Sequence, residues 1–376
     1  MAKVTLTNVS KIYRGEKGSD LTALKGLSLE IRDREFIVLT GPRGCGKSSA
    51  LRMVAGLEEI SKGDIFIGER QVNDLPAKNR DVAMIFENDS LYPQMTVYDN
   101  VAFPLELRKF GQAEIKNRVR DTASILGIGE LFERKPGALS LAQRQRVAAA
   151  RAIVRQPKIF LFDEPLANLD PVSRAELRAE MTKLHQRLEA TVIYATEDPL
   201  EAMTMADRIV VLNKGVVQQT DTPFALYDYP ANSFVAGFLG SPPINFLRGD
   251  LKQQRNALLF WEANGGTIEV SLPMAERPGA GEFIGKPVLL GIRPEDIELA
   301  EFARWKQDST VIFPAIAGLV EPMGAETILH LETGAHTMLC RSQCALDRRE
   351  VGHRLQVKMN VKKVHLFDPV TTKRIV

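Results

Sequence analysis

A chain of 376 residues is long enough for two or three domains, each with a sizeable core. Its 49 lysines and arginines nearly balance 47 aspartates and glutamates, which argues against the basic footprint of a nucleic-acid-binding protein. Three cysteines exclude a disulfide framework and no apolar run is long enough to cross a bilayer, so we expect a soluble chain from a reducing compartment that meets a membrane only through partners.

The first two-thirds of the chain alternates strand and helix patterns. Val4 and Leu6, and later residues 27–31, alternate with polar residues and predict antiparallel strands. Further patterns predict an α/β core with a helical insertion between residues 87 and about 158. The expected strands are 36–40, 64–67, 82–86, 159–162 and 191–195, and the expected helices are 47–56, 98–109, 112–126, 140–155 and 171–189. A hairpin over 208–219 and a short helix over 222–227 complete this part.

The character of the sequence changes after Pro230. Prolines punctuate a linker-like stretch, and the helical period largely disappears. Short strands separated by glycine or proline are expected at 288–292, 311–315, 327–331 and 356–361. This pattern predicts a small second domain, an all-β barrel of oligonucleotide/oligosaccharide-binding (OB) type.

One glycine-rich segment follows a predicted strand and opens a helix. Residues 41–48 read GPRGCGKS and match G-x-x-x-x-G-K-[ST]. The glycines let backbone N–H groups surround phosphates, and the helix N-terminus adds positive partial charge. Lys47 is expected to reach the β- and γ-phosphates, and Ser48 to ligate Mg²⁺. The sequence therefore predicts ATP binding.

Two carboxylates, Asp163 and Glu164, follow the apolar run Ile159–Phe162. Ligands of open α/β sheets lie outside the carboxyl ends of the strands, so this pair is expected to face a metal-bound phosphate. An acidic turn after a core strand is the alternative for the pair alone. The glycine-rich segment upstream argues against that alternative.

Together these motifs resemble the ATPase subunit of an ATP-binding cassette (ABC) importer of the carbohydrate and glycerol-phosphate uptake class. The resemblance covers nearly the whole chain and includes LYPQMTVYDNVAFPL at 91–105, EAMTMADRIVVL at 201–212, FVAGFLGSPPINFL at 234–247, GIRPEDIEL at 291–299 and VEPMGAETILHL at 320–331. It implies an ATP-binding domain over 1–235, with a RecA-like core, an antiparallel β subdomain and a helical subdomain at about 87–158. It also implies an OB-fold, TOBE-like regulatory domain over 236–376.

The resemblance implies roles for individual residues. Tyr13 resembles the aromatic residue that stacks on adenine, with a hydrophobic strand-end residue as the alternative. Asp163 would hold Mg²⁺ through water, and Glu164 would act as the general base for the attacking water. Ser140 resembles the serine that contacts the γ-phosphate bound to the opposite subunit, and residues 168–170 resemble a loop at the dimer interface.

The full set of expected site residues follows from these motifs. The expected nucleotide contacts are Tyr13, Gly41, Pro42, Arg43, Gly44, Cys45, Gly46, Lys47, Ser48, Ser49, Ser140 and Gln143. The expected metal ligands are Ser48, Glu87 and Asp163, and the expected catalytic residues are Glu87, Glu164 and Glu197.

The chain departs from the family pattern at its phosphate-sensing motifs. Glu87 stands where the family has a glutamine, and Glu197 stands where it has a histidine that grips the γ-phosphate. Leu141 and Ala142 replace the two glycines of the LSGGQ signature, and Arg43 stands where related loops usually carry serine. Neutral drift is the alternative to altered turnover, and the coincidence of three changed motifs favours altered turnover.

The charge of Glu197 is the most consequential change. Two unit charges 4 Å apart repel by about 4 kcal/mol at an effective dielectric near 20. Glu197 must therefore move, take up a proton or pair with a cation. Arg43 is the candidate partner, although an outward, solvated arginine is the more common arrangement in a loop. Because Leu141 and Ala142 add Cβ atoms, the contact across the dimer should also loosen, and we expect slow turnover.

Two function classes follow. In the first, the chain energises an importer for sugars or related solutes at the cytoplasmic face of the cell membrane. Its helical segment near 88–105 would receive a cytoplasmic helix of a permease, and a solute-binding protein would be an indirect partner. In the second, it is a nucleotide-binding regulator or scaffold dimer that turns over ATP poorly. A soluble ATPase of repair or translation is disfavoured by the barrel and the neutral charge. The solute, and pairing with itself or with another cassette, stay open.

Overall fold

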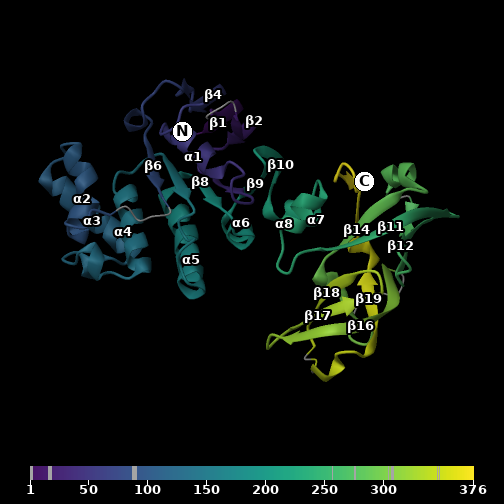
Figure 1. The fold of residues 1–376 in the computed structure, drawn as a ribbon. Coiled ribbons are helices and arrows are strands. Elements are labelled where there is room, and N and C mark those ends of the chain that lie inside the picture. Colours follow the sequence, from purple (N-terminus) through teal and green to yellow (C-terminus); the bar gives the residue numbers. More distant parts are fainter. Residues whose placement is uncertain are drawn as a thin grey trace. The chain divides into compact units, whose positions relative to one another are not determined.

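The computed structural model describes residues 3–15, 19–86, 91–255, 257–274, 277–303, 305, 309–344, 346 and 348–376. The chain forms two compact units, Met1–Pro223 and Phe224–Val376 (Figure 1). The division falls inside the short helix α7 (Pro223–Asp228), so α7 and α8 (Ser233–Phe238) group with the C-terminal strands. The domain boundary expected from the sequence lies after residue 235.

A six-stranded sheet forms the centre of the N-terminal unit, in the order β10-β9-β3-β8-β7-β6. Its strands are β3 (Phe36–Thr40), β6 (Val82–Ile85), β7 (Ile159–Asp163), β8 (Thr191–Thr196), β9 (Arg208–Asn213) and β10 (Val216–Asp221). All neighbours are parallel except the hairpin β9–β10, which confirms the turn expected near residue 214. Every residue of β3, β7 and β8 is buried, as expected for central strands covered on both faces.

A second, antiparallel sheet has the order β2-β1-β4-β5. It consists of β1 (Val4–Tyr13), β2 (Leu21–Ile31), β4 (Lys62–Ile67) and β5 (Arg70–Gln71). The strand expected at 64–67 was grouped with the α/β core, and this placement is wrong. Its apolar residues Ile65 and Ile67 lie opposite Leu6 and Val4 of β1 instead, so its apolar face joins the N-terminal sheet.

The helices of the N-terminal unit are α1 (Lys47–Ala55), α2 (Val97–Leu107), α3 (Gln112–Leu126), α4 (Leu141–Ile153), α5 (Pro171–Leu188) and α6 (Pro199–Met205). Figure 1 shows α2, α3 and α4 gathered on the side of the edge strand β6, as a helical subdomain. Side-chain caps begin several helices, because Thr96, Ser140 and Asp170 accept hydrogen bonds from the first-turn N–H groups. Short 3₁₀ turns cover Ala77–Asn79, Gly129–Leu131 and Pro136–Ala138.

The C-terminal unit is built from two antiparallel sheets around one apolar core. The first has the order β13-β12-β11-β14-β20-β21 and the second β15-β19-β16-β17-β18. The strands are β11 (Asn245–Gln254), β12 (Ala257–Glu262), β13 (Glu269–Pro273), β14 (Pro287–Ile292), β15 (Ile297–Leu299), β16 (Thr310–Pro322), β17 (Thr327–Glu332), β18 (Thr337–Ser342), β19 (Arg354–Asn360), β20 (His365–Phe367) and β21 (Arg374–Ile375). Short 3₁₀ turns cover Pro278–Phe283, Pro294–Asp296, Arg348–Glu350 and Val361–Lys363.

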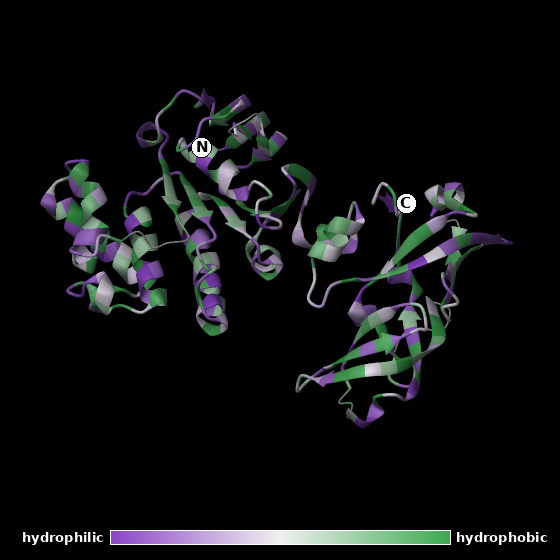
Figure 2. Cartoon of the chain, viewed as in Figure 1, coloured by the Kyte–Doolittle hydropathy of each residue, from purple (hydrophilic) through white to green (hydrophobic). Residues whose placement is uncertain are grey.

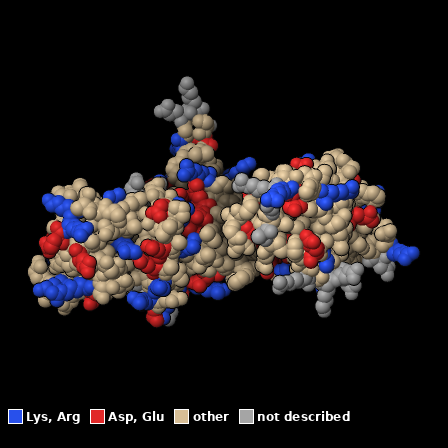
Figure 3. Space-filling model, turned by 90° about the horizontal axis from the view of Figure 1, so that it is seen from below, with Lys and Arg blue, Asp and Glu red and all other residues tan. Residues whose placement is uncertain are grey.

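Both sheets contribute to the same core, with Leu247, Phe260 and Leu290 from the first and Phe313 and Leu329 from the second. Figure 2 shows hydrophobic residues running along these strands, while the surface helix α5 is mixed. Figure 3 shows Lys and Arg interspersed with Asp and Glu over the face in view, as the near-neutral net charge indicates. Over the described ranges, no helix is long and apolar enough to cross a membrane.

Candidate functional site

The loop between β3 and α1 contains glycines that no other residue could replace without moving the neighbouring backbone. Gly41 has φ 146° and Gly46 has φ 106°, both in the region that favours glycine. A Cβ on Gly41 would lie 2.1 Å from the carbonyl oxygen of Leu212, and one on Gly46 would lie 2.5 Å from that of Ala23. The loop is therefore held tightly between neighbouring segments, and it ends at the N-terminus of α1, where unpaired N–H groups favour anions.

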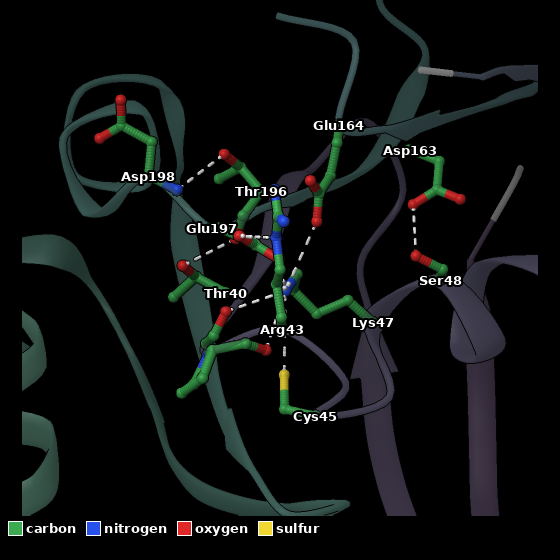
Figure 4. Close-up of polar contacts among 12 residues, drawn as sticks. Thr40, Arg43, Cys45, Lys47, Ser48, Asp163, Glu164, Thr196, Glu197 and Asp198 are labelled. Carbon is green, nitrogen blue, oxygen red and sulfur yellow. Dashed lines mark hydrogen bonds and ion pairs between the residues drawn. The ribbon is translucent and has the colours of Figure 1, made fainter. Parts of the chain in front are cut away.

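Lys47, the first residue of α1, folds back over this loop (Figure 4). Its Nζ donates to the carbonyl oxygens of Gly41 at 2.8 Å and Pro42 at 3.2 Å. The same ammonium lies 3.6 Å from a carboxylate oxygen of Glu164 and 3.7 Å from one of Glu197. The Lys47 side chain is only 3% exposed, so this buried cation depends on the carbonyls and carboxylates around it.

Ser48 and Asp163 meet on the other side of Lys47. The Ser48 hydroxyl donates to Oδ1 of Asp163 at 2.7 Å, and Arg52 lies 4.0 Å from Oδ2. Asp163 is the last residue of β7, so the parallel sheet places its carboxylate at the edge where α1 begins. A hydroxyl beside a carboxylate is a set of hard oxygen donors of the kind that Mg²⁺ prefers, so these two residues fit the expected ion.

Glu164 is held in a strained backbone conformation directly after β7. Its φ is 47°, in the left-handed region, and its N–H donates to the carbonyl oxygen of Ala195 at 3.0 Å. Burial raises the pKa of its carboxyl group, while Lys47 opposes the rise and Glu197 and Asp163 add to it. A carboxylate whose pKa is raised toward neutrality is suited to accept a proton from a nearby water.

Glu197 is paired with Arg43. Nε of Arg43 donates to Oε2 of Glu197 at 3.0 Å, and Oε1 of Glu197 faces Lys47 (Figure 4). Of the three possibilities for Glu197, the described contacts therefore show pairing with a cation. The Arg43 side chain is nonetheless 88% exposed, and it uses only Nε for this bond. The pair is open to solvent on the arginine side and reaches the buried ammonium on the other.

Two distant segments meet here because β3 and β8 are parallel neighbours. The register places Thr40 opposite Thr196, and the Thr40 hydroxyl donates to the carbonyl oxygen of Thr196 at 3.0 Å. Each strand ends at the same edge, one before the loop that carries Arg43 and one directly before Glu197. The sheet thus brings together residues that are 154 positions apart.

A buried carboxylate that the motifs did not reveal, Glu201, bonds side chains of β8, the strand directly before Glu197. It accepts hydrogen bonds from the Thr196 hydroxyl at 2.7 Å and from the Tyr194 hydroxyl at 2.8 Å. Asp198 caps α6 by accepting from the N–H of Leu200 at 2.8 Å. Burial raises the pKa of Glu201. On sequence Glu201 reads as an ordinary helix-surface residue, so only its spacing from Tyr194 and Thr196 hints at the network.

Tyr13 lies at the end of β1 near the start of α1. Its hydroxyl donates to Glu58 at 2.6 Å and shares a hydrogen bond of 2.9 Å with Ser49. The ring is 36% exposed, and Nζ of Lys11 lies 4.9 Å from its centroid. A partly exposed aromatic ring tied to the first turn of α1 fits a base-stacking role, which stays a prediction.

Cys45 is a free, buried cysteine within the loop. Burial raises the pKa of its thiol, so it contributes packing rather than a reactive thiolate.

The Ser140–Gln143 segment forms the N-terminus of α4. The Ser140 hydroxyl accepts from the N–H of Gln143 at 3.2 Å, and the Gln143 side chain accepts from the N–H of Ser140 at 3.0 Å. Leu141 and Ala142 pack against a small apolar cluster formed by Leu166, Leu169 and Leu177. Among the described residues, Ser140 and Gln143 bond to each other at the start of α4.

Glu87, which was expected both as a catalytic residue and as a metal ligand, lies outside the described residues. The other expected metal ligands, Ser48 and Asp163, are in contact with each other.

Comparisons with known proteins agree with this geometry. The family model of the ABC transporter matches residues 24–167, that of the MalK OB fold domain matches 240–297, and that of the TOBE domain matches 290–367. The chain is 46% identical to the trehalose/maltose import ATP-binding protein MalK of Thermococcus litoralis, over 100% of both chains. It is also 46% identical to the oligosaccharides import ATP-binding protein MsmX of Bacillus subtilis, again over 100% of both.

A solved structure resembles the N-terminal part. It is a dimeric post-hydrolysis state of an ATP-binding cassette bound to ADP and Pi. The TM-score is 0.53 at 30% sequence identity, and the match covers 58% of this chain and 98% of the cassette.

Proposed function

This chain belongs to the ATP-binding subunits of ABC sugar importers, and we propose that it powers uptake of a carbohydrate or related solute with a turnover set by its altered phosphate-sensing residues. The observation that carries the proposal is the buried contact of Lys47 with both Glu164 and Glu197, while Arg43 pairs with Glu197. The phosphate-binding lysine and the candidate general base of an ATPase therefore lie together. Glu197, whose charge is partly offset by Arg43, stands where the family has a histidine.

The residues divide the work of ATP hydrolysis among them. Lys47 and the loop N–H groups bind the phosphates, and Ser48 and Asp163 hold Mg²⁺, which when bound neutralises phosphate charge. Glu164 takes the proton of the attacking water, and its raised pKa brings it closer to the operating pH. Tyr13 supplies the stacking surface for adenine.

Arg43 and Glu197 lead us to expect a turnover that is slow rather than absent. A carboxylate beside the γ-phosphate opposes the charge that develops there, by about 4 kcal/mol at 4 Å and an effective dielectric near 20. Arg43 offsets part of this repulsion because its guanidinium is charged and lies 3.0 Å from the carboxylate. A donor to the developing charge is still lost, and such a loss typically costs about 10²–10³ in rate.

Two cassettes complete each site. We expect Ser140 and Gln143 to reach the nucleotide held by the opposite subunit; the resembling cassette is a dimer bound to ADP and Pi, which is compatible with this arrangement. In a homodimer both sites carry all the substitutions, whereas a heterodimer with an unaltered cassette places Glu87 and Glu197 in one site and Leu141 and Ala142 in the other.

A groove between the helical subdomain and the sheet fits a permease helix. A cavity of about 470 Å³ is lined by Phe86, Tyr92, Phe103, Leu107, Arg151 and Arg155, among others. Arg151 lies 5.4 Å from the Tyr92 ring centroid, and Arg155 also lines the groove, so the lining is both aromatic and cationic. Burial lowers the pKa of Arg155. An amphipathic helix of a membrane subunit would fill such a groove and hold the chain at the cytoplasmic face of the membrane. A solute-binding protein would deliver the solute on the other side.

The groove can be tested with two matched exposed leucines. Leu107 lines the groove and Leu21 lies on β2, and both side chains are 67% exposed. Leu107→Asp should abolish stimulation of ATP hydrolysis by the permease subunits while leaving basal hydrolysis unchanged. Leu21→Asp should leave both the stimulation and the basal rate unchanged. Equal stimulation of both variants would overturn the groove assignment. The full-length import relatives disfavour the regulator or scaffold alternative.

A further inference from the structure

The C-terminal unit contains a second polar cavity, far along the chain from the residues described above. It has a volume of about 370 Å³ and is lined by four cationic side chains, which are Arg277, Lys362, Lys363 and Arg374. Among the described residues that line it, Asp228 supplies the one side-chain carboxylate. Four cationic side chains against one acidic side chain and the main-chain carboxylate of Val376, the last residue, leave an excess of positive charge in a chain whose formal net charge is only +2.

The cations come from separate segments and are held in place by the fold. Nη2 of Arg277 donates to the carbonyl oxygen of Val364 at 3.2 Å. Arg374 belongs to β21, and its guanidinium lies 5.4 Å from the ring centroid of Tyr229. Lys363 lies 3.2 Å from Asp228. The wall is therefore partly preorganised, as small-molecule sites usually are.

The pKa of His365, which lines the cavity, is sensitive to the positive charges around it. Its pKa is lowered to about 4, first by burial and then by the cations Arg374, Arg293, Arg277 and Lys363. The imidazole is consequently neutral at physiological pH and keeps one N–H that can donate to a ligand. Concave walls of one charge sign concentrate ions of the opposite sign, so the cavity attracts anions.

The residue types narrow the class of anion. The planar guanidinium forks of Arg277 and Arg374 match the oxygens of a phosphate group, and lysines add point charges. A water molecule occupies about 30 Å³, and a phosphate ion only a few times that, so the cavity leaves room for an organic part. Its size falls near the lower end of the range of small-molecule sites.

We propose that this cavity, formed by Arg277, Lys362, Lys363 and Arg374, binds a small phosphorylated organic anion of the sugar-phosphate type. A site of this kind would let the C-terminal unit respond to phosphorylated sugar inside the cell. That regulatory meaning rests on the proposed function in sugar import, whereas the binding itself does not.

Calorimetry on the full-length protein tests the site. A saturating non-hydrolysable Mg-ATP analogue fills the phosphate loop, including its γ-phosphate position, so phosphate binding there does not interfere. Glucose 6-phosphate should bind, inorganic phosphate should bind more weakly, and glucose should not bind. Arg374→Gln should weaken glucose 6-phosphate binding between about tenfold and a hundredfold, the range for a charge-assisted hydrogen bond. Lys362→Gln, at an exposed position, should weaken it several-fold without affecting the fold.

Arg354 on β19 is the matched control, because it is exposed and does not line the cavity. Arg354→Gln should leave the affinity unchanged. The proposal is overturned if glucose 6-phosphate does not bind, if it binds no better than inorganic phosphate, or if Arg374→Gln and Lys362→Gln bind as the wild type does. If the wild-type protein binds glucose 6-phosphate but does not hydrolyse ATP, that result would count against the proposed function and not against this cavity.

Discussion

The ion pair between Arg43 and Glu197 is the feature that most sharply separates this chain from a cassette with a histidine at position 197. We expect Glu197→His to raise the rate of ATP hydrolysis and Arg43→Ser to lower it. Since Oε1 of Glu197 lies 3.7 Å from the Lys47 ammonium, its carboxylate is close to where that ammonium meets the γ-phosphate. Removing the carboxylate removes a repulsion and restores a donor in one step.

The magnitudes follow from distance and exposure. Uncompensated repulsion at about 4 Å amounts to about 4 kcal/mol at an effective dielectric near 20. Arg43 offsets only part of this, because a pair with a solvent-exposed arginine is typically worth less than about 1 kcal/mol. A restored donor contributes about 10²–10³ in rate, so Glu197→His should accelerate hydrolysis at least tenfold even with Glu87, Leu141 and Ala142 unchanged.

A double-mutant cycle isolates the pair. Steady-state phosphate release is measured for the wild type, Arg43→Ser, Glu197→His and the double variant. Arg43→Ser should slow the wild type several-fold and should have little effect once position 197 is histidine, because the arginine then has no carboxylate to offset. Brisk turnover in the unmodified protein that Glu197→His leaves unchanged would refute the reasoning. Additive effects of the two changes would refute the coupling.

Three further outcomes are expected. Lys47→Ala should abolish Mg-ATP binding measured by calorimetry, and unchanged affinity would remove the assignment of the phosphate loop. A fragment ending at Pro223 should fold and bind nucleotide, and it should be more soluble than one ending at Gly240, because Ala236 of α8 packs against Ile244 and Phe367 of the C-terminal unit; a 1–223 fragment that fails to fold contradicts this. The lowered pKa of His365, about 4 against 6.5, means that the unfolded chain binds its proton more tightly, so this residue destabilises the fold progressively as pH falls from about 6.5 to 4. Asp296 has the opposite sign, because its pKa is raised from 3.8 to about 6 and its stabilisation is lost as pH rises through that range. Denaturant unfolding should therefore show that the free energy of unfolding of His365→Gln rises by up to about 3 kcal/mol relative to that of the wild type as pH falls from 6.5 to 4. A difference in unfolding free energy that stays constant over this pH range would contradict the pKa assignment.

Elements with strong local signals could be predicted from the sequence alone. The apolar runs of β3, β7 and β8 and the starts of α4 and α5 lie close to where the patterns indicated. Strands β11, β12 and β13 were not assigned. In β11 and β13 buried and exposed residues alternate as in a half-buried strand, but these short stretches follow the proline-rich segment and were grouped with the linker.

The positions of the expected site residues were easier to predict than their contacts. Lys47 and Ser48 begin a helix after the loop, and Asp163 and Glu164 lie at a strand end, as motif spacing that is local in sequence predicts; their roles stay predictions. Arg43 was named from the sequence as the candidate partner of Glu197, with a solvated arginine as the more common arrangement. The bond itself depends on the parallel register of β3 and β8, which no local pattern encodes. The bonds of Glu201 to Tyr194 and Thr196 were missed for the same reason, since the burial of Glu201 arises only when α6 packs onto the sheet.

Phosphate release by the full-length protein, with and without its permease subunits, tests most directly whether the chain hydrolyses ATP to energise transport. The wild type should be slow alone and faster with the permease, and Glu164→Gln should reduce both rates by about 10²–10⁴, the usual contribution of a general base. A wild-type rate no higher than that of Glu164→Gln in the presence of the permease would contradict the account and identify a nucleotide-binding subunit that does not power uptake.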